Sequence, residues 1–179
     1  MNGGLERAAR GVFLVGFMGC GKTTVGRLLA EELGWTFADL DDDIEARENA
    51  AISRIFAERG EAEFRRIETE CLKARVEEIR ASRPLVVAAG GGAYTQARNR
   101  ELVAAGGVAI WLDCPFERIE KRVAGFTHRP LARDPEAFRK LYDARRTAYA
   151  LADYRVATKS DDPEEAVREI LKLQGLFER

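Results

Sequence analysis

The segment from Gly16 to Thr23, with the sequence GFMGCGKT, has the residue types and the spacing of a phosphate-binding loop. It follows an apolar run at 12–15 and precedes a helical pattern of apolar residues that begins at Val25. In such a loop, glycines let backbone N–H groups face a phosphate, and the helix N-terminus adds partial positive charge. Lys22 would reach the outer phosphates, and the Thr23 hydroxyl would ligate Mg²⁺. A glycine-rich turn formed by chance is the alternative. We expect nucleotide contacts from Gly19, Cys20, Gly21, Lys22, Thr23 and Thr24.

Two carboxylates follow the next apolar segment, at Asp39 and Asp41. Phosphoryl transfer needs charge neutralisation, a divalent metal and an oriented nucleophile. Asp39 would hold Mg²⁺, directly or through water, while Asp41 would orient an acceptor hydroxyl and take its proton. The alternative is that the acidic run 41–43 only caps the helix that follows.

Three consecutive glycines, Gly90, Gly91 and Gly92, end another apolar segment. A turn needs only one or two glycines, so the triplet indicates that the backbone approaches a ligand closely. Arg65 and Arg145 are candidates for binding an anionic acceptor, because a guanidinium group matches a carboxylate. Most of the 29 basic residues will be solvated, and that is the alternative for both.

The stretch 125–135 has no sustained hydrophobic period and contains Arg129 next to Pro130. We expect a mobile lid there. A lid can bring an arginine onto the transferring phosphate and exclude water, which would otherwise compete with the acceptor. An ordinary surface loop is the alternative.

Composition sets limits on the class of protein. The chain has 179 residues, enough for a single domain over 1–179, and 29 basic against 30 acidic residues give a net charge of −1. Nothing in this balance indicates nucleic acid or a membrane as partner. The three cysteines are far apart in the sequence, and we expect them to be reduced thiols. The single histidine, His128, does not provide a zinc site. We expect a monomeric cytoplasmic protein.

Strand-like and helix-like segments alternate along the chain. Strands are predicted at 12–15, 35–40, 84–89, 108–112 and 154–158, and helices at 22–34, 44–59, 61–80, 96–105, from 115, 136–151 and from 163. This alternation predicts a three-layer α/β/α fold with a central parallel sheet of about five strands. Ligands bind at the carboxyl ends of such strands, so the phosphate loop, the two aspartates and the glycine triplet should converge on one cleft.

Several motifs, in order, resemble the shikimate kinase family of P-loop kinases along nearly the whole chain. They are GFMGCGKT with the helix beginning VGRLLA, FADLD at 37–41 continuing to Ile44 and Glu45, the segment from Ile55 through Gly60 to Glu68, the glycine triplet, and Arg129-Pro130-Leu131. The resemblance implies ATP-dependent phosphorylation of the 3-hydroxyl of shikimate, with Mg²⁺, as a step of chorismate and aromatic amino acid synthesis.

The resemblance also assigns roles to residues. It implies that Asp39 serves the metal, that Asp41 binds shikimate as the proposed base, and that Arg129 contacts the phosphate. Arg65 and Arg145 would bind the shikimate carboxylate, and Arg122 would pack on adenine. The adjacent Arg146 leaves the second carboxylate-binding arginine open by one residue. Two departures from the family pattern are Thr147, where proline is frequent, and Ala89, where threonine is frequent.

Two rival functions remain. A kinase for another hydroxy acid such as gluconate would not require the set Asp41, Arg65, Gly90 to Gly92 and Arg145 in this form. A catalytically silent nucleotide-binding protein would have no reason to keep Lys22, Asp39, Asp41 and Arg129 together.

Overall fold

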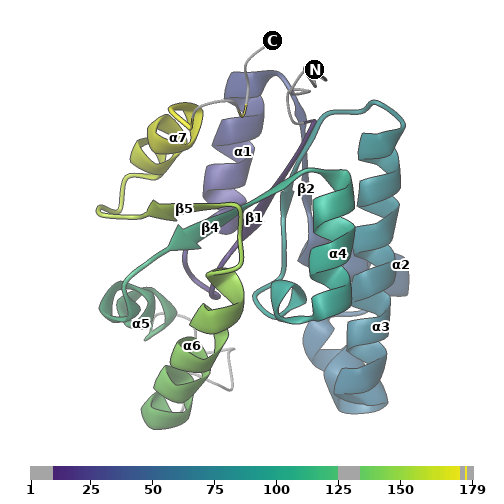
Figure 1. Cartoon of the computed structure of the whole chain (residues 1–179). Helices are drawn as coiled ribbons and strands as arrows, with labels where there is room; N and C mark the ends of the chain where they lie inside the picture. Colours follow the sequence, from purple (N-terminus) through teal and green to yellow (C-terminus); the bar gives the residue numbers. More distant parts are fainter. Residues whose placement is uncertain (1–9, 125–133, 174–175, 177–179) are drawn as a thin grey trace.

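The computed structural model describes residues 10–124, 134–173 and 176. Strands and helices alternate along the chain (Figure 1). The strands are β1 (Gly11–Val15), β2 (Thr36–Asp39), β3 (Leu85–Ala88), β4 (Val108–Asp113) and β5 (Tyr154–Ala157). The helices are α1 (Lys22–Leu33), α2 (Leu40–Glu48), α3 (Ile52–Arg80), α4 (Ala97–Gly106), α5 (Phe116–Ala124), α6 (Pro135–Tyr149) and α7 (Pro163–Leu171), with a short 3-10 turn η1 (Ala93–Thr95).

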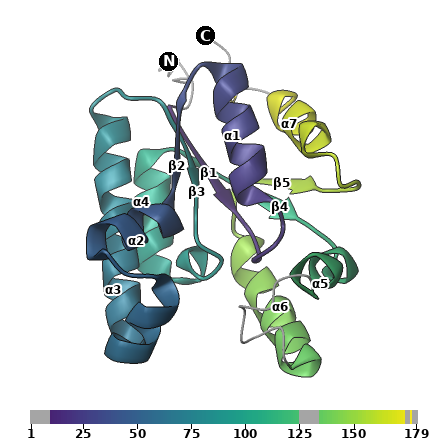
Figure 2. The ribbon, with the colours of Figure 1, turned by 180° about the vertical axis from the view of Figure 1, so that it is seen from behind.

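The five strands form one parallel sheet in the order β2-β3-β1-β4-β5. Helices α1 and α7 cover one face, and α3 and α4 cover the other (Figures 1 and 2). The predicted fold class is therefore confirmed. Because β1 lies in the middle with β3 and β4 as its neighbours, its carboxyl end is the place where loops from both halves of the sheet can meet.

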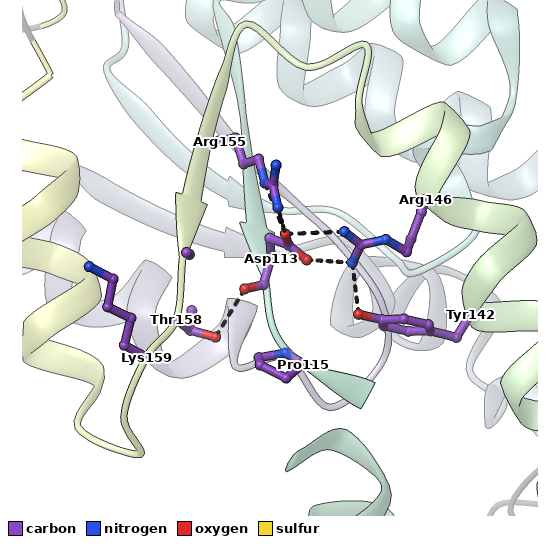
Figure 3. Close-up of a pocket in the computed structure, with 8 residues that line it drawn as sticks. Asp113, Pro115, Tyr142, Arg146, Arg155, Thr158 and Lys159 are labelled. Atoms are coloured by element: carbon purple, nitrogen blue, oxygen red, sulfur yellow. Dashed lines mark hydrogen bonds and ion pairs between the residues drawn. The ribbon is translucent and has the colours of Figure 1, made fainter. Parts of the chain in front are cut away.

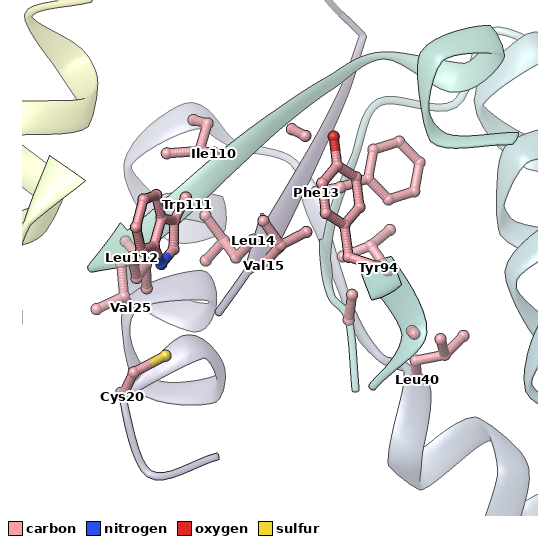
Figure 4. Packing of buried hydrophobic residues seen from close by; sticks show 14 of the residues in the cluster. Phe13, Leu14, Val15, Cys20, Val25, Leu40, Tyr94, Ile110, Trp111 and Leu112 are labelled. Carbon is pink, nitrogen blue, oxygen red and sulfur yellow. The ribbon is translucent and has the colours of Figure 1, made fainter. Parts of the chain in front are cut away.

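The central strands are apolar because both of their faces are covered. Residues 12–15 of β1 are fully buried, and Ile110 and Leu112 of β4 are buried beside them (Figure 4). Gly26 lets α1 approach the sheet, since a Cβ there would lie 2.5 Å from Cε2 of Phe37 in β2. This close approach fixes the start of α1 against the end of β2.

One predicted helix is wrong. The pattern over 44–59 predicts a single helix, but α2 begins at Leu40 and ends at Glu48, and the residue after it, Asn49, has a left-handed backbone with φ of 49°. The early start has a physical cause: the Asp39 side chain accepts a hydrogen bond from the backbone N–H of Asp41 and caps the helix. The predicted break at Gly60 is confirmed by its non-helical backbone (φ 79°, ψ 171°) inside α3.

Two further observations bear on the sequence expectations. Arg129 and most of the predicted lid lie outside the described residues, and only Asp134 and Pro135 of that stretch are described. In the described ranges, no helix is long and apolar enough to cross a membrane.

Candidate active site

The phosphate loop connects β1 to α1. Gly16, Gly19 and Gly21 have φ values of 143°, 78° and 99°, which side chains with a Cβ rarely adopt. Lys22 Nζ donates hydrogen bonds to the carbonyl oxygens of Gly16 (2.9 Å) and Phe17 (3.1 Å). The ammonium group is therefore held within the loop, at the N-terminus of α1.

Thr23 and Asp39 meet where α1 begins and β2 ends. The Thr23 hydroxyl donates to Asp39 Oδ2 over 2.6 Å, and Asp39 Oδ1 accepts from the N–H of Asp41. Hydroxyl and carboxylate oxygens suit Mg²⁺, which is usually held by one or two carboxylates together with substrate phosphates. The described residues contain no cluster of three or more metal-ligating His, Cys, Asp or Glu side chains. The donor set fits a magnesium ion that takes its remaining ligands from phosphate and water.

The carboxylates of Asp41 and Glu68 lie against Gly90. A Cβ at Gly90 would come within 2.9 Å of Asp41 Oδ1 and 3.0 Å of Glu68 Oε1. A Cβ at Gly92 would overlap the guanidinium group of Arg65. The structure thus explains two members of the glycine triplet by steric crowding from the charged side chains on α2 and α3.

Glu68 holds Arg65 in place. The two side chains form an ion pair of 2.8 Å, with Glu68 only 1% exposed and Arg65 18% exposed. Burial raises the pKa of Glu68, and the neighbouring Arg65 guanidinium opposes that shift. Glu68 is not among the predicted site residues, although its position carries a signal. It lies four residues after Phe64, on the buried face of the helix, where an unpaired carboxylate is costly.

Arg145 and Arg146 project from α6 into different pockets. Arg145 lines the cleft with Arg65, and its guanidinium carbon lies 5.6 Å from the centre of the Phe17 ring. Arg146 instead pairs with Asp113 through N–O distances of 2.6 and 3.3 Å. Successive residues on a helix are about 100° apart, which explains how neighbours face different surroundings. The geometry favours Arg145 over Arg146 as the arginine of the cleft.

Tyr149 connects α6 to the glycine triplet. Its hydroxyl donates to the carbonyl oxygen of Gly91, and its ring is almost completely buried, 6.1 Å from that of Trp111. A Cβ at Gly91 would lie 3.3 Å from Arg145 Nη1. Burial raises the pKa of Tyr149, so the hydroxyl keeps its proton and remains a donor. Helix α6 therefore holds the Gly91 backbone through Tyr149 and also positions the Arg145 guanidinium beside it.

Arg122 also lines the cleft, from α5. It donates to the carbonyl oxygen of Gly19 over 3.0 Å and pairs with Asp161 at 2.7 Å. These contacts join the phosphate loop to the segment after β5. Arg129, which was expected to contact the phosphate, lies outside the described residues.

One cleft of about 1290 Å³ brings these groups together. It is larger than the roughly 300–1,000 Å³ typical of a pocket for a single small ligand, which leaves space for two substrates. Ala89, one of the two departures, also lines it. The predicted residues that line the cleft are Gly19, Cys20, Gly21, Lys22, Thr23, Thr24, Asp39, Asp41, Arg65, Gly90, Gly91, Gly92, Arg122 and Arg145.

Comparisons with known proteins point to one family. The family model described as shikimate kinase matches residues 18–174. A curated shikimate kinase from Persephonella marina is 42% identical over 163 residues, which cover 90% of this chain and 97% of the relative.

Solved structures show the same likeness. The shikimate kinase from Acinetobacter baumannii, solved in complex with shikimate, has a TM-score of 0.83 and 38% identity, covering 94% of this chain and 93% of that one. The shikimate kinase from Aquifex aeolicus has a TM-score of 0.80 and 36% identity, covering 90% of this chain and 94% of that one. Sequence and structure together establish that this chain belongs to the shikimate kinase family.

Proposed function

We propose that this protein transfers the γ-phosphoryl group of ATP to the 3-hydroxyl of shikimate, giving 3-phosphoshikimate and ADP. The reaction would be a step of chorismate and aromatic amino acid synthesis, and its expected setting is a monomer in the cytoplasm. The observation that carries the proposal is a single cleft in which the phosphate loop faces Asp41, the Arg65–Glu68 pair and Arg145.

The nucleotide side of the cleft would bind ATP. Main-chain N–H groups of 19–24 would contact the phosphates, and the ammonium of Lys22 would offset the charge that develops on the transferring group. Arg122 donates to the carbonyl oxygen of Gly19 and lines the cleft, and it would contact the adenine, as the family resemblance implies. Arg129 would add positive charge at the phosphate, as the family resemblance implies.

Thr23 and Asp39 would hold Mg²⁺ between them and the phosphate oxygens. When bound, the ion supplies charge neutralisation at the phosphates. The short Thr23–Asp39 contact keeps both oxygens at the junction of α1 and β2, facing the cleft. Both groups come from rigid elements, so neither needs reordering when the metal arrives.

The acceptor side would bind a hydroxylated carboxylic acid. Arg65 and Arg145 would bind its carboxylate, and the backbone of Gly90 to Gly92 would lie against its ring. Asp41 would orient the hydroxyl and accept its proton during transfer. Glu68 would keep the Arg65 guanidinium fixed at the carboxylate, since the two are already paired in the structure.

A coupled assay for ADP release tests the proposal. Shikimate, gluconate and nucleoside monophosphates are offered as competing acceptors, with Mg²⁺ and ATP in excess. We expect turnover with shikimate and background rates with the others. Turnover with gluconate and not with shikimate would identify gluconate as the acceptor. ATP binding without turnover on any acceptor would favour a catalytically silent nucleotide-binding protein.

A further inference from the structure

A second pocket lies outside the active-site cleft, where β4 ends (Figure 3). We call it the Asp113 pocket. Its volume is about 320 Å³, and residues 157–159 line both this pocket and the cleft. The lining residues are Asp113, Pro115, Tyr142, Arg146, Arg155, Ala157, Thr158 and Lys159.

The pocket is strongly basic for a protein of this composition. Two cationic side chains, Arg146 and Arg155, converge on a single carboxylate, Asp113, and Lys159 lines the pocket with its ammonium directed away from them (Figure 3), so the formal charge of the lining is +2. The whole chain has a net charge of −1. The side chain of Asp113 is only 9% exposed, and a single carboxylate neutralises only one of the two guanidinium groups bonded to it.

Both guanidinium groups are held in fixed positions. Arg146 bonds to both oxygens of Asp113 and to the Tyr142 hydroxyl at 2.8 Å. Arg155 donates to Asp113 Oδ2 through Nε at 2.9 Å and also through Nη2. The guanidinium carbons of Arg146 and Arg155 lie 4.9 and 5.0 Å from the ring centre of Trp111. The side chains converge on one point from α6 and β5 (Figure 3).

The two arginines retain hydrogen-bond donors. A guanidinium group carries five N–H donors. In the described part of the chain, Nη1 and Nη2 of Arg146 make three hydrogen bonds, and Nε and Nη2 of Arg155 make two. Nε of Arg146 and Nη1 of Arg155 take part in none of these bonds. Arg146 links α6 to β4 and Arg155 links β5 to β4, both through Asp113, and together they bring one more positive charge than that carboxylate neutralises.

We propose that the Asp113 pocket binds a small oxyanion of the phosphate type. Two converging guanidinium groups match the charge and the several acceptor oxygens of a phosphate better than they match one carboxylate. Their positions are set in advance by Asp113 and Trp111, so little side-chain entropy is lost on binding. The ligand is either free phosphate or the phosphate group of a monoester.

Binding there would also affect the active site. Arg145 and Arg146 are adjacent on α6, and residues 157–159 form a wall of both pockets. An anion in the Asp113 pocket would lower the positive potential near Arg145, and a carboxylate acceptor would then bind less tightly. This second effect rests on the proposed function, whereas the binding itself does not.

The test is calorimetric titration of inorganic phosphate into the protein. Shikimate, Mg²⁺ and a non-hydrolysable ATP analogue are kept saturating, so that the cleft is filled, and chloride holds the ionic strength constant. A parallel titration with glycerol phosphate separates free phosphate from a monoester, since the tighter ligand identifies the source. We expect one binding event in the wild type.

Arg155→Gln should weaken that event at least about tenfold, the scale of one lost charge-assisted hydrogen bond. Arg155→Lys keeps the positive charge but lacks the paired N–H donors of a guanidinium group, so its affinity for phosphate should lie between those of the wild type and Arg155→Gln. Arg139→Gln is the matched control, because Arg139 is an exposed arginine on α6 outside the pocket. No binding of either ligand to the wild type, or equal binding by wild type and Arg155→Gln, would overturn the proposal.

A kinetic readout tests the second effect separately. At saturating ATP, phosphate should raise the KM for shikimate in the wild type and in Arg139→Gln but leave it unchanged in Arg155→Gln. An equal rise in all three proteins would contradict the coupling. If the protein does not phosphorylate shikimate, the titration still decides whether the site exists.

Discussion

The nucleotide side and the acceptor side of the cleft are built in different ways. The nucleotide side comes mainly from one continuous segment, 19–24, at a strand-to-helix junction. The acceptor side is assembled from α2, α3, the turn after β3 and α6, with side chains such as Asp41, Arg65 and Arg145 far apart in the sequence. Phosphate recognition therefore depends on local backbone geometry, whereas acceptor recognition depends on the packing of several elements.

This contrast has a consequence for mutations. A change on the acceptor side should leave nucleotide binding intact if the two sides are independent.

The largest effect is expected for Asp41→Asn. Loss of the proposed general base should lower turnover at least about a hundredfold, while ATP binding stays close to that of the wild type. The measurements are steady-state rates and nucleotide titration. Asp42→Asn is the matched control, because Asp42 is exposed and does not line the cleft. Near wild-type turnover by Asp41→Asn would remove Asp41 from its proposed role.

Arg65→Ala should mainly weaken acceptor binding. Removing a charged hydrogen-bond donor should raise the dissociation constant for shikimate about tenfold to a hundredfold, and it leaves Glu68 buried without its partner. Titration of shikimate and of nucleotide measures both sides of the cleft. The control is Arg66→Ala, since Arg66 is an exposed neighbour paired with Glu63 and Glu70. Unchanged affinity for shikimate in Arg65→Ala would contradict the role.

Arg145→Gln and Arg146→Gln form a matched pair on α6. We expect Arg145→Gln to raise the KM for shikimate about tenfold, because its guanidinium lines the cleft, and Arg146→Gln to change it little, because that side chain faces Asp113. Kinetics with shikimate as the varied substrate decide between them. The reverse ranking would assign carboxylate binding to Arg146.

The smallest effect is expected for Glu68→Gln, since glutamine can still accept a hydrogen bond from Arg65. The KM for shikimate should rise about threefold at neutral pH. A second readout is stability. Burial raises the folded-state pKa of Glu68 above its ordinary value of 4.5, so the folded protein binds more protons than the unfolded one between those two values.

The sign of the pH effect follows from this difference. The stability of the wild type relative to Glu68→Gln should be greatest below pH 4.5 and should fall as the pH rises through the folded-state pKa. Denaturant unfolding of both proteins over that pH range measures it. Parallel stability curves would show that Glu68 has the same pKa in the folded and unfolded states.

Much of the architecture was accessible from local patterns. The apolar runs at 12–15 and 84–89 predicted two strands, and the structure places them side by side in the sheet. The boundary between α2 and α3 was not accessible in the same way. The apolar period continues across it, and the left-handed turn at Asn49 has no strong local signal.

Within the site, the phosphate loop is predictable from sequence alone. Three glycines with positive φ, a lysine and a threonine lie within eight positions, so backbone geometry alone brings them together. Even the break in α3 is local, because Gly60 can adopt a φ of 79° at low cost.

Which charged side chains face the cleft depends on how the helices pack. The sequence did not distinguish Arg145 from Arg146 as the second carboxylate-binding arginine. In the structure, Arg145 lines the cleft, whereas Arg146 of the same helix contacts Asp113 of β4. The structure likewise shows that Glu68 is buried against Arg65 and Gly90. The physical reason is that these contacts join elements distant in sequence, and their orientation is set by helix packing, which a local pattern does not specify.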